Sequence, residues 1–232
     1  MNFSAKKGRI GILGGISHES TIRYYELILK EYYQRCGDYY YPEIIIFSLD
    51  FQRFTDYEDK KDMKGYVQYI MEGIRSLEKA GVDFILMAAN SPHSVFFQIE
   101  KAATVPLLSI VCVTAEKAAS EGRKSLLLLG ISYTMQSKFY QQTCAAYGIE
   151  VNPPSPEHQE IINTIIFDEL VIGVFTEESK QKLLQIISSY EVDGVILGCT
   201  ELPLLLTQED TTVPLYDTLH LHATAALEYA LG

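Results

Sequence analysis

The sequence of 232 residues lacks long hydrophobic runs and an excess of positive charge, and each absence excludes a class of partner. No run approaches the roughly 18 apolar residues that a membrane-spanning helix needs, so we expect no membrane partner. The 19 Lys and Arg residues are outnumbered by 30 Asp and Glu residues, and the net charge of -11 argues against nucleic acid and anionic membranes as partners. An acidic small-molecule substrate stays compatible with this charge, because backbone N–H groups make a pocket locally positive.

The sequence also lacks paired cysteines, and we expect no secretory leader. Its four cysteines are Cys36, Cys112, Cys144 and Cys199, and none forms a C-x-x-C pair. Residues 1–15 contain two lysines before a strand-like run that is too short for the apolar region of a signal peptide. We therefore expect a cytoplasmic protein with reduced thiols. The five histidines do not combine with cysteines at zinc-binding spacing, so no metal site is expected.

The chain does contain short apolar segments that alternate with longer amphipathic segments. This alternation is typical of an α/β protein with parallel sheets. The expected strands are residues 9–15, 43–49, 83–89, 105–111, 125–130, 194–199 and 213–216. The expected helices are residues 18–33, 61–81, a helix that begins near 91, 114–122, 135–147, 160–172, 177–190, 201–206 and 219–231.

Parts of the sequence occur twice in the same order. The matching segments are VDFILMAAN (82–90) with VDGVILGCT (192–200), TVPLLSI (104–110) with TVPLYDT (212–218), and RIGILGG (9–15) with KSLLLLG (124–130). Similar strands are common in α/β proteins, but three matches in one order favour a duplication. The sequence therefore predicts two pseudo-symmetric lobes, each a parallel sheet flanked by helices. The expected N-terminal lobe comprises residues 1–103 plus 211–232, and the C-terminal lobe comprises residues 104–210.

The duplication predicts an active site at the lobe interface. Ligands of parallel α/β sheets bind beyond the carboxyl ends of the strands, so Ala89 and Cys199 are expected to face one small ligand. Asn90, Ser91 and Thr200 follow these strand ends and offer helix-capping side chains and free backbone N–H groups. Such helix starts attract a substrate carboxylate, and the same field is expected to lower the pKa of the Cys199 thiol.

A free cysteine is usually a small buried hydrophobe, and this is the alternative for Cys199. Its position at a strand end, between Gly198 and Thr200, favours a functional role, because a glycine there permits close approach of a ligand. Glu201 follows as a first-turn acid that suits the helix dipole. Cys36, Cys112 and Cys144 are expected to be structural.

Four segments carry a resemblance to a known family. GILGGISHEST (11–21), AANSPH (88–93), GCTELP (198–203) and VPLYDTLHLHATAAL (213–227) resemble the aspartate/glutamate racemase superfamily over nearly the whole chain. The stretch that begins GGISHESTIRYYELI is similar to the broad-specificity or L-aspartate/glutamate-type branch. The resemblance implies a racemase that acts on an acidic amino acid without pyridoxal phosphate or any other cofactor. It also implies a homodimer.

The family's chemistry needs a proton-transfer group on each side of the α-carbon. Its members usually have a cysteine at both strand ends, and the resemblance makes Cys199 the second of them. Ala89 occupies the first position and carries no proton. Three alternatives follow: Ser91, His93 or a water substitutes in a racemase of reduced activity; the protein is a one-cysteine decarboxylase or isomerase; or it is a non-catalytic binder of a dicarboxylate or amino acid.

The resemblance also implies a set of substrate-binding residues. They are Gly15, Ile16, Gln52, Arg53, Asn90, Ser91, Thr200 and Glu201. Gly15 follows Gly14 in a strand-to-helix turn whose N–H groups suit an anion, although two glycines alone are a weak signal. Arg53 is the candidate partner of a side-chain carboxylate, while a lone surface arginine is more often simply solvated.

Overall fold

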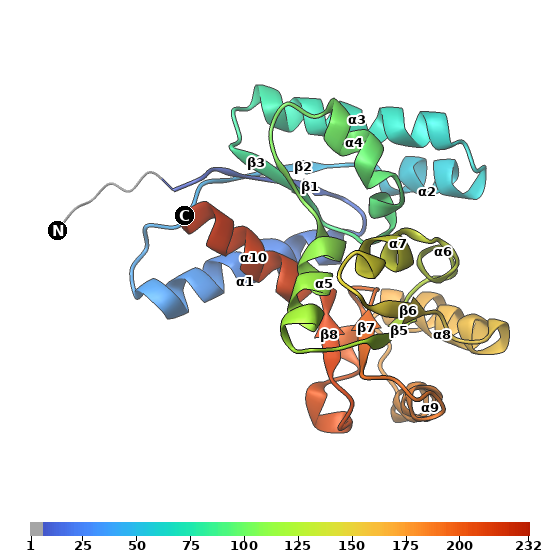
Figure 1. Ribbon diagram of the computed structural model, residues 1–232. Coiled ribbons are helices and arrows are strands. Elements are labelled where there is room, and N and C mark those ends of the chain that lie inside the picture. The colour runs from blue at the N-terminus through green and yellow to red at the C-terminus, as the bar shows by residue number, and fades with distance from the viewer. Residues whose placement is uncertain (1–6) are drawn as a thin grey trace. The chain divides into compact units, whose positions relative to one another are not determined.

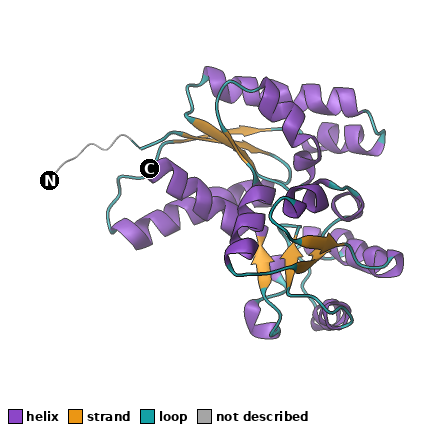
Figure 2. Ribbon diagram, in the orientation of Figure 1, coloured by secondary structure: helices purple, strands orange, loops and turns teal. Residues whose placement is uncertain are grey.

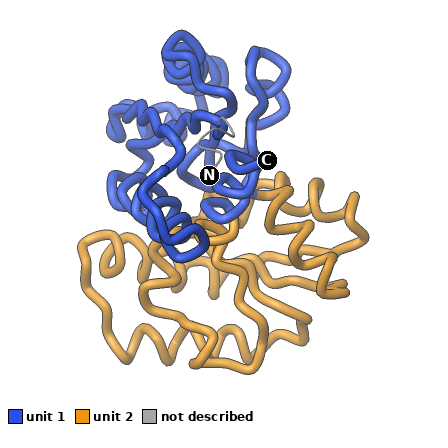
Figure 3. The backbone as a smooth tube through the Cα atoms, turned by 90° about the vertical axis from the view of Figure 1, so that its left-hand side faces the viewer, with its two compact units in different colours: residues 1–110, 222–232 blue, residues 111–221 orange. Residues whose placement is uncertain are grey.

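The structure is a computed structural model, and it describes residues 7–232. Residues 1–6, which belong to the stretch behind the localisation prediction and to the expected N-terminal lobe, lie outside the described residues. The chain divides into two compact units, coloured in Figure 3. Unit 1 ends at Ile110 and resumes with His222–Gly232, and unit 2 is Val111–Leu221.

Unit 1 contains a four-stranded parallel sheet in the order β2-β1-β3-β4. Its strands are β1 (Ile10–Gly14), β2 (Ile44–Ser48), β3 (Phe84–Met87) and β4 (Leu107–Leu108). Every residue of β1 and β3 is buried, as expected for the central strands of a sheet that helices cover on both faces. The strands of this sheet and of the second sheet are orange in Figure 2.

Helices cover both faces of this sheet. They are α1 (His18–Cys36), α2 (Phe51–Asp59), α3 (Met63–Lys79), the 3-10 helix η1 (Ser91–Val95), α4 (Phe96–Ala102) and α10 (Thr218–Leu231), whose residues from His222 onward belong to unit 1. In Figure 1, α2, α3 and α4 lie on one side of the sheet and α1 and α10 on the other. Helix α3 follows from a helical stripe in the sequence, since Ile70, Ile74 and Leu77 are fully buried in the core beneath it.

Unit 2 repeats the topology of unit 1. Its sheet has the order β6-β5-β7-β8, built from β5 (Ser125–Leu129), β6 (Glu150–Asn152), β7 (Gly194–Leu197) and β8 (Leu215–Asp217), all parallel. The last two strands pair in the same register in both units, with Ile85 opposite Leu107 and Val195 opposite Leu215. The prediction of two pseudo-symmetric α/β lobes with parallel sheets is therefore confirmed.

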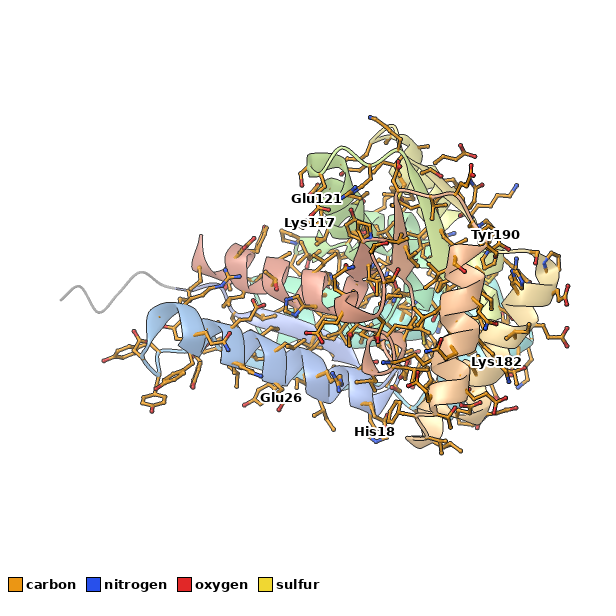
Figure 4. All side chains as sticks on the ribbon, turned by 90° about the horizontal axis from the view of Figure 1, so that it is seen from below. His18, Glu26, Lys117, Glu121, Lys182 and Tyr190 are labelled. Atoms are coloured by element: carbon orange, nitrogen blue, oxygen red, sulfur yellow. The ribbon has the colours of Figure 1, made fainter. Side chains whose placement is uncertain are left out.

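Some helices of unit 2 are more broken than expected. They are α5 (Ile110–Ser120), α6 (Ser132–Gln136), α7 (Phe139–Ala145), α8 (Pro156–Asp168), α9 (Glu177–Ser188) and the 3-10 helices η2 (Leu170–Ile172), η3 (Leu202–Leu204) and η4 (Gln208–Asp210). One hydrophobic cluster joins α8 and α9 to the strands β5 and β7. Two ion pairs with i,i+4 spacing lie at the surface of unit 2. Lys117 of α5 pairs with Glu121, the residue after this helix, and both are labelled in Figure 4. Lys182 pairs with Glu178 on α9.

The unit boundaries lie later in the chain than the expected lobe boundaries at 103/104 and 210/211. Strand β4 pairs with β3, which assigns residues 107–108 to unit 1, and β8 pairs with β7, which assigns residues 215–217 to unit 2. Each of these strands takes its hydrogen bonds from the sheet of the repeat that precedes it. The boundaries drawn from the sequence cut before these strands instead of after them.

Three local expectations were wrong. Helix α2 and strand β6 were missed, and residues 201–206 were expected to form a helix but contain only the single turn η3. Pro203 lies inside that turn, where it removes a backbone donor, and this favours a 3-10 turn over a longer α-helix. Within residues 7–232, no helix has the length and apolar content that crossing a membrane requires.

Candidate active site

The buried strand β7 ends at Leu197, and Gly198 and Cys199 follow it directly. The Gly198 N–H donates to the Leu129 carbonyl at 2.7 Å, which continues the pairing with β5 by one residue. A Cβ at Gly198 would meet the Leu129 oxygen at 2.9 Å, too close for any side chain. Glycine is therefore required at this point, and it sets Cys199 directly beyond the carboxyl end of the strand.

The Cys199 thiol is hydrogen-bonded to a carboxylate. Its Sγ donates to Oε2 of Glu201 at 3.0 Å, and the Thr200 hydroxyl donates to the same oxygen at 2.9 Å. Cys199 and Glu201 are each only 8% exposed, and Cys199 lies at the edge of the hydrophobic cluster of unit 2. A hydrogen-bond acceptor this close, in a site with little water, is suited to take a proton from sulfur.

The expected direction of the Cys199 pKa was wrong. Burial raises the pKa of the thiol well above its usual value, and the charge and hydrogen bond of Glu201 raise it further. Backbone N–H groups of Thr200 and Glu201 oppose this rise but are outweighed. Since η3 is a single 3-10 turn, it does not provide the helix dipole that the prediction assumed. Cys199 therefore rests as a thiol, and a base must remove its proton before it reacts.

The equivalent strand end in unit 1 carries Ala89, Asn90 and Ser91. All three are buried, with exposed fractions of 5 to 7%. Ala89 lies four residues after Ile85, and Cys199 lies four residues after the register-equivalent Val195, so the two positions correspond as predicted. Asn90 was expected to cap a helix, but it has helical backbone angles and its side chain makes no capping bond to η1.

His93 was one of the three expected substitutes for the missing first thiol, and its ring is held by backbone groups. The ring Nδ1 lies 3.0 Å from the Ala89 carbonyl, and Nε2 accepts the Ile110 N–H at 3.2 Å. Both ring nitrogens are therefore engaged with the backbone, and His93 fixes the strand end as a neutral ring. Burial, followed by the charge of His222, lowers the pKa of His93 to about 3.

A carboxylate that the sequence did not point out lies beside Ser91. The Ser91 side chain hydrogen-bonds Glu58, the next-to-last residue of α2, and Tyr66 of α3 donates its hydroxyl to Oε1 of Glu58 at 2.7 Å. Burial raises the pKa of Glu58, and these two hydrogen bonds partly offset the rise. Glu58 was missed because α2 was missed, although Asp50 before Phe51 is an N-cap signal, and its side chain accepts the Arg53 N–H.

The glycine turn after β1 is packed rather than open. The Gly15 N–H donates to the Thr21 hydroxyl at 2.8 Å, so this donor is already bonded. Ile16 is 6% exposed and belongs to the hydrophobic cluster of unit 1. These contacts pack the turn against α1, and the role of Gly15 and Ile16 in a substrate site stays a prediction.

Gln52 and Arg53 lie in the first turn of α2 and are both exposed. The Gln52 amide donates to Asp56 at 2.8 Å, so it is bonded within its own helix. The Arg53 guanidinium lies 4.1 Å from the centre of the Tyr69 ring and 3.8 Å from the Glu72 carboxylate. Half of the Arg53 side chain is exposed, which leaves it able to meet a further carboxylate.

Comparison with known proteins decides the family. The Asp/Glu/hydantoin racemase family matches residues 13–226. The chain belongs to this family. The broad specificity amino-acid racemase RacX of Bacillus subtilis (strain 168) is 30% identical over 216 residues, which cover 90% of this chain and 92% of that protein. The predicted superfamily and its isomerase class are thereby confirmed.

Solved structures agree with this family membership. An aspartate racemase homologue from Pyrococcus horikoshii OT3 matches with a TM-score of 0.86 and 36% identity, over 97% of this chain and 100% of that chain. The aspartate racemase of Picrophilus torridus matches with a TM-score of 0.74 and 24% identity, over 96% of this chain and 94% of that chain. The second likeness supports the fold alone. Among residues 7–232, no group of three or more His, Cys, Asp and Glu side chains is placed to hold a metal ion.

Proposed function

We propose that this racemase-family enzyme inverts an acidic amino acid, aspartate or glutamate, by proton transfer without a cofactor, with Cys199 as an essential acid and base. The observation that carries the proposal is the 3.0 Å hydrogen bond from Cys199 Sγ to Glu201 Oε2. It supplies what a buried thiol with a raised pKa needs, which is a carboxylate placed to accept its proton.

The proton steps follow from that pair. As the thiol proton moves to Glu201, Cys199 Sγ takes the α-proton of the substrate, and the electron pair stays on the substrate as enolate-like charge. We assign the donors that stabilise this charge to Asn90, Thr200 and the backbone N–H groups at the ends of β3 and β7. A proton returned to the other side of the α-carbon gives the opposite enantiomer.

The acidic side chain of the substrate needs its own partner. Arg53 is the candidate, because half of its side chain is exposed beside the Tyr69 ring and a guanidinium can donate two parallel hydrogen bonds to a carboxylate. Gln52 precedes it on α2 and is a second polar group for the same carboxylate, once it releases Asp56.

A second candidate function rests on Ala89, which carries no proton where a first thiol is expected. An enzyme with one thiol would return a proton to a single face, as a decarboxylase or isomerase of the family does. Without catalysis, the same residues would form a binder of a dicarboxylate or amino acid. These alternatives share the site and differ in the fate of the α-proton.

The test follows each enantiomer of aspartate and glutamate in D₂O, with α-proton exchange measured by NMR and inversion by chiral chromatography. We expect exchange with inversion in the wild type and a loss of both, by about 100-fold or more, in Cys199→Ala. Cys36→Ala is the matched control, because Cys36 is an exposed cysteine on α1.

Each other outcome contradicts the racemase proposal in its own way. Exchange with retention indicates a one-base enzyme, and release of CO₂ from a substituted malonate indicates a decarboxylase. Saturable binding without exchange indicates a binder. Inversion that survives Cys199→Ala would refute the role of the thiol.

We also propose that the enzyme is a homodimer that pairs through α1. Ile22, Tyr25 and Tyr33 are 45 to 59% exposed and lie on one stripe of this helix, which leaves apolar surface for a second copy to cover. Two exposed polar residues of the same helix, His18 and Glu26, are labelled in Figure 4. Analytical ultracentrifugation tests this, with a dimer expected for the wild type and a monomer for Tyr25→Glu. A monomeric wild type would contradict it.

The proposed chemistry requires Cys199 to remain a reduced thiol, and the four cysteines, all within residues 7–232, form no disulfide in the structure. We therefore propose a reducing, cytoplasmic location. Cell fractionation with an antibody checks this, and recovery of the enzyme from an extracytoplasmic fraction would contradict it.

A further inference from the structure

A groove of unit 2 runs between helices α8 and α9. Its volume is about 410 Å³, which is within the range of small-molecule sites. The residues that line it are His158, Ile161, Lys182, Gln185, Ile186 and Ser189. All of them belong to unit 2, and none is a residue assigned above to the proposed active site. The groove is therefore a candidate for a site with a ligand of its own.

The lining of this groove combines hydrogen-bond donors with aliphatic surface. Lys182 and Gln185 carry N–H donors, while Ile161 and the buried Ile186 present hydrocarbon. None of the six lining residues is an Asp or Glu, in a chain where 30 such residues outnumber 19 Lys and Arg. A lining of this composition favours an anion that also has an apolar part.

The ring of His158 is held by Tyr190, which follows Ser189. The Ser155 N–H donates to the Tyr190 hydroxyl oxygen at 2.7 Å, and this oxygen lies 2.9 Å from Nδ1 of His158. Because the Tyr190 oxygen already accepts one N–H, we assign its hydrogen to the bond with Nδ1. The neutral His158 ring then carries its proton on Nε2, which makes this nitrogen a third donor.

Lys182 supplies the positive charge of the groove, and Figure 4 labels it together with Tyr190. Its Nζ lies 2.8 Å from Glu178, and the two side chains are 51% and 78% exposed. The hydrogen bond and charge of Glu178 raise the pKa of Lys182, so the ammonium form is favoured. An exposed ion pair of this kind contributes little to stability, so a ligand carboxylate can share the ammonium group with Glu178.

We propose that this groove binds a small organic carboxylate that has an apolar body. The carboxylate accepts hydrogen bonds from Lys182, Gln185 and Nε2 of His158. The hydrocarbon part packs on Ile161 and Ile186. This inference goes beyond the proposed racemase function and does not rest on it, because it uses none of the residues assigned to catalysis.

Hexanoate is the probe for this site. It is titrated into the full chain, and the backbone amide signals are followed by ¹H–¹⁵N NMR. We expect saturable shifts centred on α8 and α9, with a dissociation constant on the order of 1 mM. Acetate lacks the apolar body and should bind about tenfold more weakly or less. Hexylammonium has the opposite charge and should not shift these signals.

Two variants test the donors. Lys182→Gln and His158→Phe should each weaken hexanoate binding about fivefold, because each removes one donor to the carboxylate. Lys117→Gln is the matched control, since Lys117 also pairs with a glutamate at i,i+4 spacing and its side chain is 49% exposed against 51% for Lys182. This control should bind hexanoate as the wild type does.

Three results would overturn the proposal. The first is a wild type that shows no saturable shifts with hexanoate. The second is a set of shifts centred on residues 198–201, which would place the carboxylate at the proposed active site. The third is equal binding by the wild type, Lys182→Gln and His158→Phe. Because the shifts are mapped on the wild type, they decide the matter even where a variant does not fold, and the inversion assay above is independent of them.

Discussion

Two buried histidines make unit 1 sensitive to acid. His222 is fully buried, accepts the Tyr24 hydroxyl on Nδ1 at 2.8 Å and donates from Nε2 to the Leu108 carbonyl at 3.0 Å. His93 accepts the Ile110 N–H on Nε2. Each ring therefore uses one nitrogen as an acceptor, and that nitrogen would have to become a donor on protonation. Protonation must break these bonds or unfold the unit.

The size of the effect follows from the pKa values. Burial lowers the pKa of His93 to about 3 and that of His222 to about 4, against about 6.5 in the unfolded chain. Because both folded values are depressed, the unfolded state binds more protons below pH 6.5, and stability is lost as the pH falls. From about pH 8 to about pH 5, each histidine should remove about 2 kcal/mol from the free energy of unfolding.

The measurement is urea unfolding followed by circular dichroism across this pH range. His222→Gln should lose about half of the histidine-dependent decline, even if its stability at the upper pH is lower. His220→Gln is the matched control, because His220 is exposed on the same helix, and its slope should equal that of the wild type. If His222→Gln and His93→Gln both retained the full wild-type slope, the decline would come from other groups and the reasoning would be refuted.

Three further predictions concern the turn, the thiol and the substrate. Gly15→Ala should reduce the free energy of unfolding by about 2 kcal/mol, measured by urea titration, because a Cβ at this positive φ collides with the Leu49 backbone. Glu201→Gln should speed alkylation of Cys199 by iodoacetamide, because loss of the Glu201 charge lowers the pKa of the thiol. The same variant should slow racemisation by about 100-fold, because it removes the group that accepts the thiol proton. Arg53→Lys should raise KM for acidic amino acids about tenfold and leave KM for neutral ones unchanged, since only the former need the two-pronged donor.

The sheets could be predicted from the sequence because their signal is strong and local. VDFILMAAN and VDGVILGCT are buried runs that end in a turn, and each runs through a central strand, β3 or β7. Strand β6 was not predicted because it is three residues long and Val151 is its single buried residue. Helix α2 escaped because it begins three residues after a strand and buries only Phe54, which leaves little periodicity to detect.

The chemistry of the site was harder to predict than its position. The strand ends were identified by the repeat, yet the direction of the Cys199 pKa depends on a balance between backbone N–H groups and desolvation that only coordinates resolve. His93 is another example, because the Ile110 N–H that occupies its ring lies 17 residues further along the chain. Glu58 is 33 residues before Ser91 in the sequence, and no sequence pattern links the two residues.

The single thiol of the proposed site has a consequence that thermodynamics restricts. Two enantiomers have equal free energies in water, so the equilibrium constant for racemisation is unity and kcat/KM must be equal in both directions. A thiol backed by Glu201 therefore does not make the enzyme favour one product. The asymmetry must appear instead in how often the abstracted proton exchanges with solvent before inversion. Because only one enantiomer presents its α-proton to Cys199, the ratio of exchange to inversion in D₂O should differ between the enantiomers, and an equal ratio would indicate that Cys199 serves both faces.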